Sequence, residues 1–243
     1  MRVLLSAFFW TYLVGSLVVF WFAVVPVWLI VTPFDRLRRF SHWYATTWAS
    51  QCIAISPFWR VRVSGRDRIP NRGAFVLAAN HLSAADIMVL FRVRKHFKWV
   101  AKESLFRLPF LGWMMSMAGY VPIKRGSAES RHEMFRACHR HLRRGSSVMI
   151  FPEGTRSRDG EIQEFRMGAF KLAVDADVPV VPIVVEGTLE VLPVKTWVFQ
   201  HERIIDVSVR VLDPVAPAEV DYDPERLRDE VRARICADYR GVG

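Results

Sequence analysis

The stretch Ala74-Phe75-Val76-Leu77-Ala78-Ala79-Asn80-His81-Leu82-Ser83-Ala84-Ala85-Asp86 changes from an apolar run to polar residues within a few positions, and a second apolar run follows it. A short apolar run bounded by polar residues is typical of a buried strand. We therefore predict a strand over residues 74–79 and a helix over residues 84–94. His81 and Asp86 would then lie where the strand ends and the helix begins.

His81 and Asp86 are the candidate catalytic residues. A neutral imidazole can take the proton of an attacking hydroxyl, which contributes roughly 10²–10⁴-fold to a rate. A carboxylate that accepts from the other ring nitrogen fixes the tautomer and stabilises the imidazolium. On a straight helix, five residues would turn the two side chains about 140° apart. If Ser83 is the N-cap, His81 lies in the incoming loop and can fold back over the first turn to meet Asp86.

The same residues have a simpler interpretation. Ser83-Ala84-Ala85-Asp86 resembles a capping box, and an aspartate is favourable near a helix N-terminus. A single histidine is often an ordinary polar residue, and the chain has no Gly-x-Ser-x-Gly elbow that would supply a serine nucleophile. On these residues alone, helix capping and catalysis both remain open.

A second polar cluster, Phe151-Pro152-Glu153-Gly154-Thr155-Arg156-Ser157, follows the apolar run 147–151. That run is typical of a buried strand, and ligands of open α/β sheets bind beyond the carboxyl ends of the strands. A guanidinium in such a turn can hold a phosphate through two hydrogen bonds. Pro-Glu-Gly-Thr is also an ordinary turn sequence. The arginines nearby, Arg156, Arg158 and Arg166, favour an anion site.

Together the two clusters resemble the 1-acyl-glycerol-3-phosphate acyltransferases, or lysophosphatidic acid acyltransferases, membrane-associated glycerolipid acyltransferases with a His-x4-Asp motif. Further matching stretches run in order from about residue 60 to 190: residues 101–105 with Pro109 and Gly112, then 119–126, 165–168 and 181–187. The resemblance implies the glycerolipid acyltransferase fold, with His81 as general base and Asp86 as its partner. It implies that substrate is bound by Lys102, Arg125, Glu153, Gly154, Thr155, Arg156 and Arg166.

The chain departs from the family pattern at Arg166, where lysine is more frequent; the two cations bind phosphate differently. The resemblance implies transfer of a fatty acyl group from acyl-CoA or acyl-acyl carrier protein to the sn-2 hydroxyl of 1-acyl-glycerol-3-phosphate, giving phosphatidic acid in phospholipid biosynthesis. No cofactor is expected. Alternatives are another acceptor (lyso-ornithine lipid, glycerol-3-phosphate or another lysophospholipid), a non-catalytic anionic-lipid-binding membrane protein, or an acyl-CoA hydrolase.

Residues 3–34 contain no charged side chain. About 20 residues cross ~30 Å of hydrocarbon, so this segment can form one tilted helix or a helix that breaks near Pro26. It is too long for a cleaved signal peptide. Only Arg2 precedes it, whereas Arg36, Arg38 and Arg39 follow, which predicts an inner-membrane protein with its catalytic domain in the cytoplasm.

Residues 37–59 combine Trp43, Tyr44, Trp48 and Trp59 with basic residues, a mixture typical of the membrane–water interface. The alternative is a core helix rich in aromatic residues, and we favour the interfacial interpretation. We therefore predict a membrane-anchoring helical segment over residues 1–59 and an α/β catalytic domain over residues 60–243.

Beyond the first stretch, short apolar runs alternate with helical patterns. We predict strands near 97–101, 120–123, 147–151, 180–185 and 205–212, and helices over 109–118, 127–144, 168–176 and from Asp223-Pro224 onward. This alternation predicts an α/β fold with a mixed, largely parallel sheet flanked by helices.

The net charge of +10 calls for an anionic partner. No nucleic-acid-binding motif is present, so we expect membrane phospholipid, lysophosphatidic acid and the acyl donor rather than nucleic acid. Residues 131–144 read as a basic amphipathic helix, either a solvated face or a surface for the membrane or the donor carrier. We expect no metal, because His139 and His141 diverge on a helix, and no disulfide among the three scattered cysteines.

Overall fold

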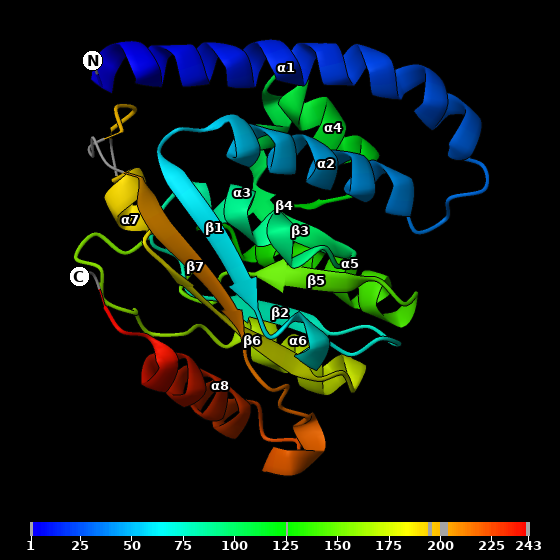
Figure 1. Cartoon of the computed structure of the whole chain (residues 1–243). Helices are drawn as coiled ribbons and strands as arrows, with labels where there is room; N and C mark the ends of the chain where they lie inside the picture. The colour runs from blue at the N-terminus through cyan, green and yellow to red at the C-terminus, as the bar shows by residue number, and fades with distance from the viewer. Residues whose placement is uncertain (1, 125, 194–195, 200–203, 242–243) are drawn as a thin grey trace.

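The computed structural model describes residues 2–124, 126–193, 196–199 and 204–241. These contain a seven-stranded sheet in the order β1-β7-β6-β2-β5-β3-β4 (Figure 1). Every neighbouring pair is parallel except β6 and β7. The strands are β1 Trp59–Ser64, β2 Val76–Ala79, β3 Phe97–Lys102, β4 Val121–Ile123, β5 Ser147–Ile150, β6 Val180–Glu186 and β7 Ile205–Val211.

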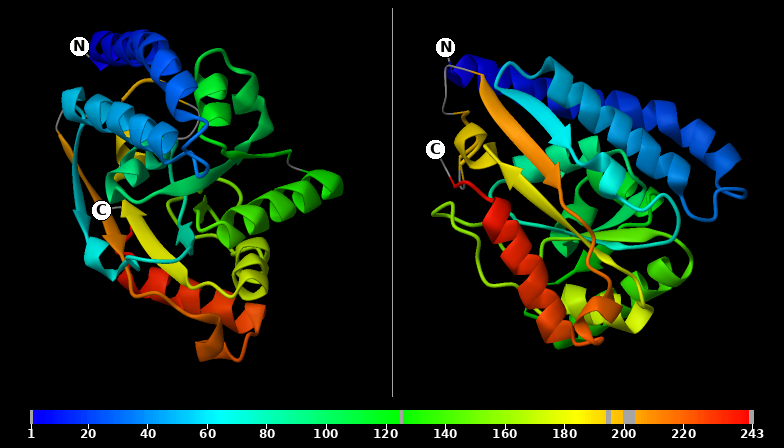
Figure 2. Two further views of the ribbon diagram at one scale, coloured as in Figure 1. Left: turned by 90° about the vertical axis from the view of Figure 1, so that its right-hand side faces the viewer. Right: turned by 60° about the horizontal axis from the view of Figure 1, so that its bottom comes forward.

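Helices cover both faces of this sheet (Figure 2). One buried cluster joins it to α1, α2, α3 and α4, and a second joins its other face to α5, α6 and α8. The helices are α1 Arg2–Val31, α2 Arg39–Ile55, α3 Ala85–Leu90, α4 Leu111–Met117, α5 Ala128–Arg143, α6 Gly168–Ala176, α7 Thr188–Val191 and α8 Pro224–Asp238, with short 3-10 turns at Arg66–Arg68, Phe91–Val93, Glu103–Arg107 and Pro217–Val220. The predicted fold class, a mixed and largely parallel α/β sheet, is confirmed.

Strand β1 was not among the predicted strands. Its burial alternates, and the arginine side chains Arg60 and Arg62 both face solvent. It is an edge strand that pairs in parallel with β7. Because an edge strand buries only part of its surface, it carries a weaker apolar signal than the central strands do.

Helix α1 continues through Pro26 and lies along the side of the domain rather than projecting from it (Figure 1). Contacts hold it near its start and further along: the backbone N–H of Phe199 donates to Oγ of Ser6, and Tyr44 donates its hydroxyl hydrogen to the carbonyl of Phe20. Its outer face is apolar and exposed. By length and composition α1 could cross a membrane.

The interfacial interpretation of residues 37–59 is wrong for two of the four aromatic residues that suggested it. Trp48 and Trp59 are 7% and 5% exposed, and His42 is buried against Phe97 and Tyr120. Trp43 is 59% exposed. Helix α2 is therefore mainly the core helix that the alternative interpretation described, because aromatic residues suit a core as well as an interface.

Candidate active site

His81 lies just beyond the carboxyl end of β2 and is 8% exposed. Its Nδ1 is 2.7 Å from Oδ2 of Asp86, so the expected contact between the two side chains is present. With Asp86 as a carboxylate, Nδ1 donates its hydrogen to Oδ2 and Nε2 is left as the acceptor. No residue in the described ranges forms a hydrogen bond with Nε2. That nitrogen is free to accept a proton from a substrate.

The Asp86 carboxylate is fully buried and accepts four hydrogen bonds. Besides His81, the backbone N–H groups of Leu82 and Ser83 donate to Oδ2 at 2.7 and 2.9 Å, and the Thr188 hydroxyl donates to Oδ1 at 2.5 Å. One carboxylate therefore both binds the loop backbone before α3 and contacts the imidazole.

The predicted N-cap is wrong by one residue. Helix α3 begins at Ala85 with Ala84 as its N-cap, so Asp86 is its second residue rather than its third. Ser83 accepts from the Ala85 N–H and donates its hydroxyl hydrogen to the carbonyl of Leu192 at 2.6 Å. The hydroxyl thus ties the loop to the residue that follows α7.

The turn after β5 holds the backbone of His81 on both sides. The His81 N–H donates to Oε1 of Glu153 at 2.7 Å, and the Ser157 N–H donates to the His81 carbonyl at 2.8 Å. Because β2 and β5 are parallel neighbours, their carboxyl ends bring the loop and the turn together. The turn after β5 and the loop that carries His81 thus form one unit.

Phe151 stacks on the imidazole of His81, with ring centroids 3.8 Å apart and planes within 10° of parallel. Its ring also stacks with Trp99. The stacking fixes the plane of the imidazole and covers one of its faces, while Asp86 fixes its rotation. The imidazole is therefore held through the backbone of His81, through Nδ1 and through one ring face.

Glu153 was expected to bind substrate, and the structure places it elsewhere. Its carboxylate is buried and accepts from the backbone of His81 and, at 3.1 Å, of Gln163. Burial raises its pKa to about 7, although the two backbone hydrogen bonds act in the opposite direction. Glu153 therefore faces inward and supports the histidine loop.

The other expected substrate-binding residues are mostly exposed. Arg156 and Lys102 are exposed and form no ion pair with any described residue. Arg166 is exposed too, and its guanidinium lies over Gly154, where an added Cβ would come within 2.8 Å of Nε. Thr155 is exposed beside Arg156, and Arg125 lies outside the described residues. The turn therefore presents cations beside His81.

Sequence reasoning gave no role to three residues that support the histidine: Phe151, Ser157 and Thr188. The first two lie in the turn cluster itself, so their place beside a candidate anion site was a usable signal. Thr188 follows strand β6 and the Gly187 turn, and nothing local in the sequence links it to Asp86.

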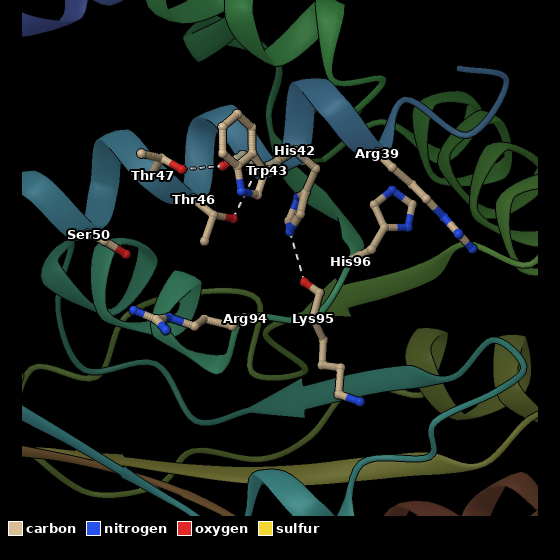
Figure 3. Close-up of a pocket in the computed structure, with 9 residues that line it drawn as sticks. All are labelled: Arg39, His42, Trp43, Thr46, Thr47, Ser50, Arg94, Lys95 and His96. Atoms are coloured by element: carbon tan, nitrogen blue, oxygen red, sulfur yellow. Dashed lines mark hydrogen bonds between the residues drawn. The ribbon is translucent and has the colours of Figure 1, made fainter. Parts of the chain in front are cut away.

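A separate cavity of about 480 Å³ lies between α2 and the residues before β3 (Figure 3). His42, Arg94, Lys95 and His96 are among its lining residues. Strands β2 and β3 both run parallel to β5. The cavity therefore lies at the amino ends of these strands, whereas His81 lies at their carboxyl ends. None of the expected site residues lines it. The described residues also contain no group of three or more side chains that could hold a metal.

The fold and the paired histidine and aspartate beside the arginine turn define an α/β protein of the glycerolipid acyltransferase class. Residues 60–186, more than half of the chain, match the family model described as Acyltransferase, and the chain belongs to this family. The resemblance drawn from the sequence motifs is therefore confirmed.

The chain is similar to chloroplastic 1-acyl-sn-glycerol-3-phosphate acyltransferases. It is 36% identical to BAT2 of Brassica napus, with 88% of this chain and 62% of the relative covered, and 37% identical to LPAT1 of Arabidopsis thaliana, with 84% and 55% covered. It thus spans little more than half of these curated relatives. The crystal structure of the 1-acyl-sn-glycerophosphate (LPA) acyltransferase PlsC from Thermotoga maritima superposes with a TM-score of 0.76 at 25% identity, covering 96% of this chain and 92% of that chain.

Proposed function

We propose that this protein transfers a fatty acyl group from a thioester donor, acyl-CoA or acyl-acyl carrier protein, to the sn-2 hydroxyl of 1-acyl-glycerol-3-phosphate, giving phosphatidic acid. The observation that carries the proposal is the 2.7 Å contact between His81 Nδ1 and Asp86, which leaves Nε2 without a partner among the described residues. The relatives and the structural neighbour, named as 1-acyl-sn-glycerol-3-phosphate or LPA acyltransferases, support the same reaction.

In the proposed reaction, Nε2 of His81 takes the proton of the sn-2 hydroxyl as its oxygen attacks the thioester carbonyl. The new C–O bond forms, the C–S bond breaks, and the imidazolium returns the proton to the leaving thiolate. Asp86 stabilises the imidazolium while it exists. The step needs no covalent acyl-enzyme.

The acceptor phosphate binds the exposed cations of the turn. Arg156 is the principal contact, since its planar guanidinium can donate two hydrogen bonds to a phosphate. The family resemblance assigns Lys102, Arg125 and Arg166 to the same phosphate. This binding holds the hydroxyl near Nε2, and such positioning can lower a barrier by several kcal/mol.

We further propose that α1 anchors the protein to one membrane leaflet and that residues 60–243 form the catalytic domain. The contacts of Ser6 and Phe20 hold α1 lengthwise on the domain, so its exposed apolar face can enter a leaflet without the helix crossing the bilayer. We assign the domain to the cytoplasmic side of the inner membrane, because anionic lipids of that leaflet would attract the arginines that follow the segment.

The test uses the full chain in detergent and measures thiol release with acyl-CoA and with acyl-acyl carrier protein. The acceptors are lysophosphatidate, glycerol-3-phosphate, lyso-ornithine lipid and lysophosphatidylcholine. Transfer to lysophosphatidate, lost in His81→Ala with vesicle binding retained, supports the proposal. Preference for another acceptor would reassign the substrate. Unchanged turnover in His81→Ala would refute the assignment of His81 as the general base. Vesicle binding without transfer to any acceptor would indicate the non-catalytic alternative.

A further inference from the structure

The residues that follow α8 contact the loop that follows β5 (Figure 1). Tyr239, the first residue beyond α8, donates its hydroxyl hydrogen to the carbonyl of Gly160 at 2.5 Å. The tyrosine is half-buried, and burial raises the pKa of its hydroxyl to about 12, so the group remains a hydrogen-bond donor at neutral pH. The carbonyl of Gly160 is therefore held by a residue 79 positions later in the chain.

Gly160 belongs to the loop that holds the backbone of His81. The Gly160 N–H donates to Oγ of Ser157 at 3.1 Å, and the Ser157 N–H donates to the His81 carbonyl at 2.8 Å. Three hydrogen bonds in series thus connect the hydroxyl of Tyr239 to the backbone of the candidate base.

This loop depends on such contacts for its shape. Residues 151–167, all of them described, form neither helix nor strand, so side-chain hydrogen bonds and packing must fix their path. From α8 itself, Arg232 reaches the carbonyl of Ile162 only at 3.5 Å. The 2.5 Å bond from Tyr239 is the closer of these two contacts with the loop, so its removal should let the loop move.

The residue after Tyr239 supports the other member of the catalytic pair. The Arg240 N–H donates to Oε1 of Glu186 at 2.5 Å, and Glu186 is the last residue of β6. Two residues further on, Thr188 donates to the Asp86 carboxylate. Because Tyr239 and Arg240 are adjacent, the chain after α8 contacts both segments that hold the histidine and the aspartate.

We propose that Tyr239 is a positioning residue for acyl transfer, because its hydroxyl fixes the loop that holds the backbone of His81. This inference rests on the proposed function. A general base must lie within hydrogen-bond reach of the proton that it takes, and a displacement of about 1 Å can be costly. Tyr239 acts through Gly160 and Ser157, so its loss should slow the reaction step without weakening the binding of either substrate.

The test is Tyr239→Phe, which removes the hydroxyl and retains the ring. The matched control is Tyr44→Phe, since Tyr44 also donates to a backbone carbonyl, that of Phe20 at 2.9 Å, but packs with the cluster on the other face of the sheet. The full chain in detergent is assayed for kcat, for KM of lysophosphatidate and acyl-CoA, and for urea unfolding. Proton NMR follows the Nδ1–H signal of His81, assigned by its loss in His81→Ala.

We expect kcat to fall about three- to tenfold in Tyr239→Phe, as loss of one hydrogen bond allows, with both KM values within twofold of wild type. The Nδ1–H signal should shift or broaden. Tyr44→Phe should lose similar stability but keep kcat within twofold and the signal unchanged. In Tyr239→Phe/Ser157→Ala the fall in kcat should be smaller than the product of the two single falls, because both changes act on one series of bonds.

Wild-type kcat in Tyr239→Phe, an equal fall in Tyr44→Phe, a change in KM alone or an unchanged Nδ1–H signal would overturn the inference. Falls in kcat that simply multiply in the double variant would overturn it too. A wild type that transfers no acyl group to lysophosphatidate would overturn the proposed function instead, and the Nδ1–H signal of Tyr239→Phe would then decide whether the tyrosine positions His81.

Discussion

The hydroxyl of Thr188 donates a 2.5 Å hydrogen bond to Oδ1 of Asp86, the oxygen that does not face the histidine. Both side chains are fully buried. Thr188 begins α7, and Asp86 belongs to α3, so this bond ties the two helices together behind His81. The histidine is therefore oriented through Asp86 by a residue 102 positions away in the sequence.

Replacing Thr188 by valine keeps its shape and removes the donor. A hydrogen bond to a charged group contributes about 1.5–3 kcal/mol, so we expect kcat to fall on the order of 10- to 100-fold. The KM for the acceptor should change little, because Thr188 does not face the substrate cations. Thr188→Ser retains the hydroxyl and should recover most of kcat. A valine variant with wild-type kcat would show that Asp86 is held well enough by its other donors.

Phe151→Leu tests the stacking on His81. Leucine retains apolar volume but gives the imidazole no flat surface at 3.8 Å. We expect lower kcat with a nearly unchanged KM for both substrates, and partial recovery in Phe151→Tyr. Steady-state kinetics with thermal unfolding as the stability control would check this. An effect on KM alone would mean that the ring contacts substrate instead of the base.

Much of the sheet and the pairing of His81 with Asp86 could be predicted because the signals are local. Central strands are continuous apolar runs, and a loop that folds over a first helical turn involves only neighbouring residues. The burial of the Glu153 side chain could not be predicted, since its partner is the backbone of a residue 72 positions earlier. The hydrogen bond from Thr188 to Asp86 likewise joins residues that are far apart in the sequence.

The errors near the N-terminus have a different cause. Aromatic and basic residues occur both at membrane interfaces and in buried helices, so composition alone did not separate the two for α2. Its partners decide the matter, and they are distant in the chain: Trp48 donates to Ser16, and His42 contacts Lys95 and Tyr120.

Glu153 should make stability depend on pH. Burial raises its pKa in the folded protein to about 7, from 4.5, so the folded state holds this proton more tightly than the unfolded chain does. The resulting stabilisation is complete below pH 4.5 and is lost as pH rises through 7. It amounts to on the order of 3 kcal/mol.

Glu153→Gln cannot titrate and isolates this effect. Urea unfolding of both proteins between pH 4.5 and 8 should show the wild type losing stability relative to the variant over that range. The glutamine variant should also lower kcat, because its amide cannot accept from both His81 and Gln163. A difference in unfolding free energy that is constant with pH would contradict the raised pKa.

Arg156→Ala should chiefly raise the acceptor KM. Arg156 is exposed and lacks any partner among the described residues, so its removal should leave folding unchanged. Loss of one charged contact with a phosphate costs about 1.5–3 kcal/mol, or roughly 10- to 100-fold in KM. Arg156→Lys keeps the charge but not the planar guanidinium, so its acceptor KM should lie between those of the alanine variant and the wild type. An unchanged acceptor KM with a raised donor KM would move Arg156 to the donor site.

Two adjacent phenylalanines of α1 separate membrane binding from folding. Phe8 is 61% exposed, whereas Phe9 is 3% exposed and packs on Phe58, Trp59 and Phe199. Phe8→Asp places a charge on the outer face and should weaken binding to phospholipid vesicles while leaving the unfolding free energy nearly unchanged. Phe9→Ala should cost about 3–5 kcal/mol of stability, because it opens a cavity in a packed aromatic cluster. Vesicle sedimentation and urea unfolding measure the two effects separately, and unaltered vesicle binding in Phe8→Asp would mean that this part of the outer face of α1 does not enter the membrane.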